Sequence, residues 1–294
     1  MGYSTTHPEN VQGPVAQPEP EAAAPPISHA SVIWISCGGC DGCTMAVLGA
    51  VSPAIEDLLG GGLTDIPGID LIHPALSLES GSRYLTSIEA AAHGEGDAFL
   101  LVVEGSLLDN GLAGAGSFSG LGSRDAQPIP AEEWVERLAA RAQAVIAIGT
   151  CAVSGGIPAA RGSVTGATGL QAFLGEDFRS RAGLPIVNVP GCAPNGDAFI
   201  ETLSHVFLAL GGLIPLDLDE LGRPRWLYSD PTALRRVGSA PTPADARVPQ
   251  QAFCPVPQRG WINRVGGCAT VGGACNGCTR RDFPDGPLSI LGAG

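Results

Sequence analysis

The chain has 294 residues, of which 44% are hydrophobic and only 15% are charged, and its formal net charge is −13. Acidic residues outnumber basic ones by 29 to 16, and every basic residue is an arginine. This balance argues against a nucleic-acid-binding protein, which needs a basic face, and no stretch is long and apolar enough to span a bilayer. The low charge suits either a subunit that buries much of its surface in a partner or a compositional habit of the source genome.

Residues 1–29 are rich in Pro, Ala, Glu and Gln, which predicts a tail that is disordered or bound to a partner. The segment has no basic start, apolar stretch or twin arginine, so we do not expect an export signal. The expected location is cytoplasmic, and any association with a membrane would go through a partner. Because that compartment is reducing, the cysteines are expected to be metal ligands rather than disulfides.

Strands and helices are expected to alternate over residues 30–216. The predicted strands are 31–35, 70–73, 98–104, 144–148 and 185–189, and the predicted helices are 44–59, 85–92, 132–141, 168–173 and 197–210. Continuous apolar strands between helices predict an α/β fold with a parallel sheet covered on both faces. Residues 217–294 lack long periodic patterns, so we expect a small irregular domain that a metal cluster would order.

Four cysteines are expected to meet at one edge of this sheet. Cys40 and Cys43 follow the first strand, and Cys151 and Cys192 follow the last two. Ligands of parallel sheets gather beyond the carboxyl ends of the strands, and four thiolates are what a 4Fe-4S cluster needs. Neighbouring glycines would let backbone N–H groups reach the sulfurs and raise the potential of the cluster. Taken singly, a cysteine after a strand is more often a small buried hydrophobe, and zinc is the alternative metal.

A second set of cysteines closes the chain: Cys254, Cys268, Cys275 and Cys278. From their spacing alone, a zinc ribbon and an iron–sulfur cluster are equally good interpretations. Cys37 could be a fifth ligand, a substitute ligand or an unliganded thiol, and unliganded is preferred. Glu104, at the end of a strand, is expected to shape hydrogen bonds beside the first set rather than to ligate iron.

Several motifs resemble those of the small subunit of nickel–iron hydrogenases. They are Trp34…Cys40-Asp-Gly-Cys43-Thr, Val102-Val-Glu-Gly105, Gly149-Thr-Cys-Ala152 and Pro190-Gly-Cys-Ala-Pro194, followed by Arg259-Gly-Trp-Ile…Cys275-Asn-Gly-Cys278. The end of the chain looks most like the high-affinity actinobacterial type. The resemblance implies a flavodoxin-like domain over residues 30–216 and a cluster-binding domain over 217–294.

By this resemblance, the first cysteine set would hold a proximal 4Fe-4S cluster and the second set a medial 4Fe-4S cluster. The family's distal cluster uses a histidine and three cysteines, but residues 226–253 contain neither type. We therefore expect two 4Fe-4S clusters and no distal cluster.

The resemblance implies the electron-transfer small subunit of a nickel–iron uptake hydrogenase, with no catalytic residues of its own. The nickel–iron centre would lie in a large subunit, and a higher oligomer of heterodimers is expected. The electron acceptor would be a quinone or a redox protein. An arginine-rich segment (Arg235, Arg236, Arg247, Arg259, Arg264) either docks an acidic acceptor or is ordinary surface. The alternatives are a hydrogen-sensing regulatory hydrogenase and a zinc-stabilised binding module.

Overall fold

The computed structural model describes residues 29–66, 68–75, 81–114, 116–228, 276–280 and 282–285, together with Cys254 and Cys268. The predicted N-terminal tail therefore lies outside the described residues except for its last position. The arginine-rich segment and Cys275 also lie outside them.

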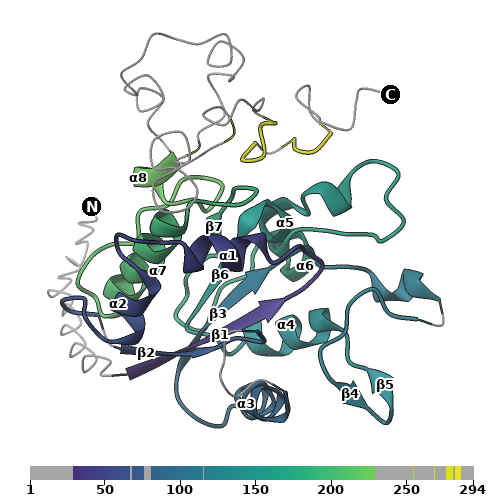
Figure 1. The fold of residues 1–294 in the computed structure, drawn as a ribbon, viewed down its shortest axis with the longest axis horizontal. Coiled ribbons are helices and arrows are strands. Elements are labelled where there is room, and N and C mark those ends of the chain that lie inside the picture. The colour runs from purple at the N-terminus through teal and green to yellow at the C-terminus, as the bar shows by residue number, and fades with distance from the viewer. Residues whose placement is uncertain are drawn as a thin grey trace, which may run out of the picture.

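A five-stranded parallel sheet forms the centre of the molecule (Figure 1). Its strands are β1 (His29–Ser36), β2 (Gly68–Ile72), β3 (Phe99–Glu104), β6 (Ala144–Ile148) and β7 (Val187–Val189), in the order β2-β1-β3-β6-β7. All neighbouring strands are parallel. This is the flavodoxin-like order, in which the chain changes direction across the sheet between β1 and β3. The predicted fold class is confirmed.

Helices cover both faces of the sheet, as the apolar strands predict (Figure 1). One face packs against α1 (Gly42–Leu48), α2 (Ile55–Leu59) and α7 (Gly196–Leu210). The other packs against α3 (Ser82–His93), α4 (Ala131–Ala139) and α6 (Leu170–Leu174). Every residue of β3 and β6 is buried, because these strands lie at the centre with helices on both sides.

The single helix predicted over residues 44–59 is wrong, because the structure has two helices there, α1 and α2. Pro53 cannot donate a helical hydrogen bond, which favours a break in this region. The Asp197 carboxylate stabilises the interruption by accepting hydrogen bonds from the backbone N–H groups of Val51 (2.8 Å) and Ser52 (3.4 Å). The sequence pattern also missed α5 (Gly149–Ser154), which begins directly after β6.

The remaining elements are short. They are the hairpin β4–β5 (Ser123–Arg124 and Gln127–Pro128), the 3-10 turns η1 (Asn110–Ala113) and η2 (Ile157–Ala159), and α8 (Arg225–Tyr228). Leu227 and Tyr228 of α8 pack against Ala198 of α7. The chain therefore reaches the first domain again after residue 216, although the domain boundary at 216/217 stays a prediction.

Candidate metal centre

The four cysteines of the first set lie in three segments at the carboxyl edge of the sheet. Cys40 lies between β1 and α1, Cys43 lies in the first turn of α1, Cys151 lies in the first turn of α5 after β6, and Cys192 follows β7. The thiol of Cys43 lies close enough to Cys40, Cys151 and Cys192 for their charges to raise its pKa. The structure thus brings all four predicted ligands of this set together.

Burial is the largest cause of the raised thiol pKa values at this edge, and the neighbouring thiols add to it. The pKa of Cys43 is raised by burial, then by the charge of Glu104 and by the three other cysteines. The pKa of Cys151 is raised by burial and then by Cys192, and that of Cys192 by burial and then by Cys40. Thiolates packed in this way repel one another unless a cationic centre joins them, so the electrostatics fit a shared metal centre.

Glycines leave room for the sulfurs. Gly149 has a φ of 83°, and a Cβ atom there would collide with the Cys43 sulfur. A Cβ atom on Gly156 would lie 2.7 Å from the Cys151 sulfur. Only residues without side chains fit at these two positions, so the backbone closes around the thiols at van der Waals distance.

Backbone hydrogen bonds beyond the ends of β1 and β3 fix the loop that leads to Cys40 and Cys43. Gly38 and Ser106 exchange two of them, of 3.0 and 2.8 Å. Gly105 allows this approach: its φ is 87°, and a Cβ atom there would lie 2.9 Å from the carbonyl carbon of Cys37. This is the topological switch point of the sheet, the place where open α/β folds bind their ligands.

Glu104, at the end of β3, holds the turn that carries Cys43 through hydrogen bonds. Its side chain is 2% exposed and accepts four hydrogen bonds. One oxygen accepts from the backbone N–H groups of Cys43 (3.0 Å) and Thr44 (3.3 Å). The other accepts from the Thr44 hydroxyl (2.5 Å) and the Trp34 indole N–H (3.1 Å). A carboxylate suits this position because all four partners donate and an ionised carboxylate only accepts.

His73 extends this polar group toward the end of β2. The Ala75 backbone N–H donates to its Nδ1 at 3.0 Å, which leaves Nε2 to carry the proton of the neutral ring and to donate to the Thr44 hydroxyl, also at 3.0 Å. The hydroxyl in turn donates to Glu104. Burial lowers the pKa of His73 to about 4, so the ring is neutral near pH 7. The sequence analysis did not single out this chain of polar groups.

Cys37 lies apart from the other four thiols of this region. It packs with the core on the α3 and α4 face, whereas Cys43 packs with the core on the α1 and α7 face. Its pKa is raised by burial and then by the charge of Glu132. These surroundings support the preferred interpretation of Cys37 as an unliganded thiol.

The second cysteine set is described only in part. Cys254, Cys268 and Cys278 are each half-buried, and Cys275 lies outside the described residues. The pKa of Tyr228 is raised by burial and then by Cys254, with a smaller contribution from Cys278, so both thiols lie near this phenol. Cys268 lies within electrostatic range of Cys192. The two cysteine sets are therefore neighbours.

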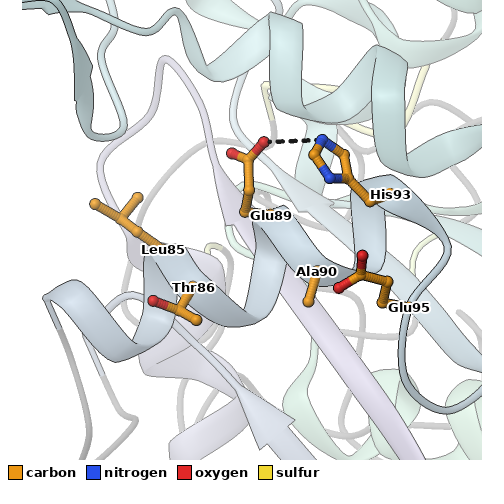
Figure 2. Close-up of a pocket in the computed structure, with 6 residues that line it drawn as sticks. All are labelled: Leu85, Thr86, Glu89, Ala90, His93 and Glu95. Atoms are coloured by element: carbon orange, nitrogen blue, oxygen red, sulfur yellow. Dashed lines mark ion pairs between the residues drawn. The ribbon is translucent and has the colours of Figure 1, made fainter.

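A shallow groove on α3 is separate from both sets (Figure 2). It is lined by Leu85, Thr86, Glu89, Ala90, His93 and Glu95, with the Glu89 carboxylate 3.2 Å from the His93 ring. No cysteine lines it, and Glu89 also pairs with Arg137 at 2.7 Å. Glu89 is thus paired with both His93 and Arg137, and no cysteine takes part, so the groove adds nothing to the candidate centre.

The residues at the carboxyl edge fit a four-thiolate iron–sulfur cluster. Within the part of the chain that the structure describes, no three His, Cys, Asp or Glu side chains are placed to hold a single metal ion. A zinc ion would gather its sulfurs at about 2.3 Å from one point. In a 4Fe-4S cluster each thiolate binds its own iron, which sets the sulfurs farther apart.

Comparison with known proteins gives one consistent family. A model described as the NADH ubiquinone oxidoreductase 20 Kd subunit matches residues 40–206. The periplasmic NiFeSe hydrogenase small subunit of Desulfomicrobium baculatum is 31% identical over 281 residues, which cover 87% of this chain and 85% of that protein.

Solved structures agree with this result. An actinobacterial-type NiFe-hydrogenase from Ralstonia eutropha H16 matches with a TM-score of 0.80 and 39% identity, over 89% of this chain and 81% of that one. The NiFeSe hydrogenase of Desulfovibrio vulgaris Hildenborough matches with a TM-score of 0.71 and 28% identity, over 89% and 97% of the two chains. No helix among the described residues is long and apolar enough to cross a membrane. The expected cytoplasmic location stays a prediction, since the D. baculatum relative is named as periplasmic.

Proposed function

Since this chain belongs to the NADH ubiquinone oxidoreductase 20 Kd subunit family, as the electron-transfer small subunit of a nickel–iron hydrogenase, we propose that it carries electrons from hydrogen oxidation through two 4Fe-4S clusters. Cys40, Cys43, Cys151 and Cys192 hold the proximal cluster. Cys254, Cys268, Cys275 and Cys278 hold the medial cluster. The acceptor is a quinone or a redox protein, and heterodimers assemble into a higher oligomer.

The observation that carries this proposal is the meeting of four cysteines from three distant segments at the switch-point edge of the sheet. Small subunits of hydrogenases carry iron–sulfur clusters, and this edge offers four thiols with glycines beside the sulfurs. When bound, a cluster there accepts and releases one electron at a time. The protein residues hold the cluster, exclude water and tune its potential.

Membership of this family implies that the chain binds a large subunit. An exposed apolar surface beside the cysteines supports this partner. Met45 and Leu48 lie on α1, directly after Cys43, and are 58% and 43% exposed. Val51, just beyond the helix, is 46% exposed. Large apolar side chains grouped in this way are typical of a protein–protein interface. We propose that the large subunit covers this surface and so brings its nickel–iron centre close to the proximal cluster.

The absence of a distal cluster is also part of the proposal. Its support is the lack of any histidine or cysteine in residues 226–253. Electrons would then leave from the medial cluster. Uptake rather than sensing is proposed as the role, and rapid dye reduction with hydrogen would support it, whereas a sensor turns over very slowly.

Metal analysis of the co-purified native complex tests the proposal. We expect nickel and about nine irons in the complex: eight in this chain, as two 4Fe-4S clusters require, and one in the nickel–iron centre of the partner. Close to thirteen irons would show a third cluster, and zinc with a colourless protein would refute the electron-transfer role.

Cysteine variants locate the clusters. Cys151→Ser is expected to remove the proximal cluster, about four of the eight irons. Cys37→Ala is the matched control, because this thiol packs into the core on the other face of the sheet. A Cys151→Ser complex that keeps all its iron would refute the proximal ligand set, and so would iron loss in Cys37→Ala alone.

A further inference from the structure

Three cysteine-bearing segments meet at the side chain of Thr150. This residue lies in the first turn of α5, directly before Cys151, and is 2% exposed. Its hydroxyl accepts a hydrogen bond from the backbone N–H of Gly191 at 3.0 Å. The same hydroxyl donates to the backbone carbonyl of Cys278 at 2.7 Å. One buried oxygen atom thus joins the Cys151 turn, the Cys192 loop and the second cysteine set.

The backbone reinforces the junction between the Cys151 and Cys192 segments. The N–H of Thr150 donates to the carbonyl of Gly191 at 3.0 Å, so the Cys151 and Cys192 segments hold each other through two hydrogen bonds. The hydrogen bond between Thr150 and Cys278 comes from the side chain of Thr150. Loss of the hydroxyl would remove the hydrogen bond to Cys278 and one of the two bonds between the proximal segments, while the backbone bond from the Thr150 N–H to the Gly191 carbonyl would stay.

We propose that the Thr150 hydroxyl is the positioning contact between the two cysteine sets, and that it sets the rate of electron transfer between their clusters. This inference rests on the proposed function. From the Cys151 sulfur to the Cys278 sulfur, the route through Thr150 consists of covalent bonds and one hydrogen bond. In each transfer one electron leaves the proximal cluster, which is oxidised, and enters the medial cluster, which is reduced. No bond breaks and no proton is transferred.

Holding Cys278 close matters because electron tunnelling weakens steeply with every added gap through space. A hydrogen bond shortens such a gap and also limits local opening of the segment. Thr150 is a positioning residue in this role, since it acts through the cysteine segments and touches neither the substrate nor the nickel–iron centre.

The test compares two variants with a matched control in the native complex. Thr150→Val keeps the shape and removes the hydroxyl, and Thr150→Ser keeps the hydroxyl. Thr202→Val is the control: this threonine is fully buried, and its hydroxyl donates only to the Ala198 carbonyl one turn away, at 2.7 Å. It joins no cysteine segments.

Three readouts distinguish a positioning role from a general loss of stability. The first is the time course of the two cluster signals in rapid-freeze electron paramagnetic resonance after mixing with hydrogen. The second is the magnetic splitting between the reduced clusters. The third is trypsin cleavage after Arg280, two residues beyond Cys278. In Thr150→Val we expect slower transfer, weaker splitting and cleavage faster by roughly fivefold, the effect of one net hydrogen bond. Thr150→Ser and Thr202→Val should behave like the wild type.

Wild-type transfer and splitting in Thr150→Val would overturn the inference, and so would a Thr150→Ser variant as impaired as Thr150→Val. If Thr150→Val does not assemble, Thr150→Ser still decides the matter, because it differs from the wild type only by a methyl group. Failure of the proposed function looks different: the wild-type complex itself would lack two clusters. Iron at the wild-type level with unchanged transfer in Thr150→Val refutes only the role of Thr150.

Discussion

Replacing Glu104 by glutamine tests how the cysteine turn is held. In the structure all four hydrogen bonds to this side chain come from donors: the N–H groups of Cys43 and Thr44, the Thr44 hydroxyl and the Trp34 indole. A glutamine has nearly the same shape but carries one oxygen and one NH₂ group. If the oxygen keeps the two backbone N–H groups, the NH₂ group must face the indole N–H, which is also only a donor.

The cost follows from these contacts. Trp34 is 3% exposed, so its N–H would be buried without an acceptor, at about 1–3 kcal/mol. The two backbone hydrogen bonds would change from charged to neutral, at about 1 kcal/mol each. The Thr44 hydroxyl can turn to accept from the new NH₂ group and need not be lost. Glu104→Gln should therefore destabilise the protein by roughly 3–5 kcal/mol.

Thermal unfolding of the native complex and its iron content measure this effect. For a domain of this size, 1 kcal/mol lowers the melting temperature by about 2–4 °C, so we expect a decrease of roughly 6–20 °C with partial loss of the proximal cluster. Glu56→Gln is the control, because Glu56 is exposed on α2. A melting temperature for Glu104→Gln within a degree or two of the control would refute the argument that this carboxylate anchors the turn.

Two further predictions concern the same edge of the sheet. Gly149→Ala should remove the proximal cluster, because the new Cβ would collide with the Cys43 sulfur. Gly162 has a similar φ of 85° but faces open space, so Gly162→Ala should keep all its iron. Equal iron contents in both variants would contradict the close packing at Gly149. His73 binds its proton at about pH 4 in the folded protein and at about 6.5 when unfolded, so it contributes stability above pH 6.5 that is lost as the pH falls toward 4. This loss should reach about 2 kcal/mol by pH 5 and should disappear in His73→Gln but persist in His93→Gln, as melting temperatures at pH 7.5 and 5 would show.

The central strands β3 and β6 were accessible to sequence reasoning because each is a continuous apolar run between helical patterns. The break between α1 and α2 was not, since the carboxylate that stabilises it, Asp197, lies 146 residues from its partner Val51. A local pattern of apolar residues at helical spacing cannot show a contact of that range. Pro53 was the one local signal that favoured a break.

The candidate site divides in the same way. The four cysteines were found because each follows a strand, and parallel strands end at one edge. Cys37 could have been placed by alternation alone: Ile33 and Ile35 face the α3 and α4 side, and Cys37 continues their series. Thr150 and His73 gave no such signal, because their roles depend on partners that only the folded chain brings near.

Three backbone N–H groups beside the cysteines donate to other groups of the protein. Sequence reasoning expects N–H groups in this region to donate to the sulfurs and raise the potential of a cluster, and that expectation stays a prediction. The N–H groups of Cys43 and Thr44 donate to Glu104, and that of Gly191 donates to Thr150. The carboxylate thus takes up two donors and adds a negative charge beside Cys43. Both effects disfavour the reduced, more negative state of a cluster, so we expect a low potential for the proposed proximal cluster. Such a potential suits an electron carrier that must pass its electron onward. Glu104→Gln should therefore raise the potential of the remaining proximal cluster, as a redox titration followed by electron paramagnetic resonance would show. An unchanged or lower potential would mean that the carboxylate serves only to hold the turn.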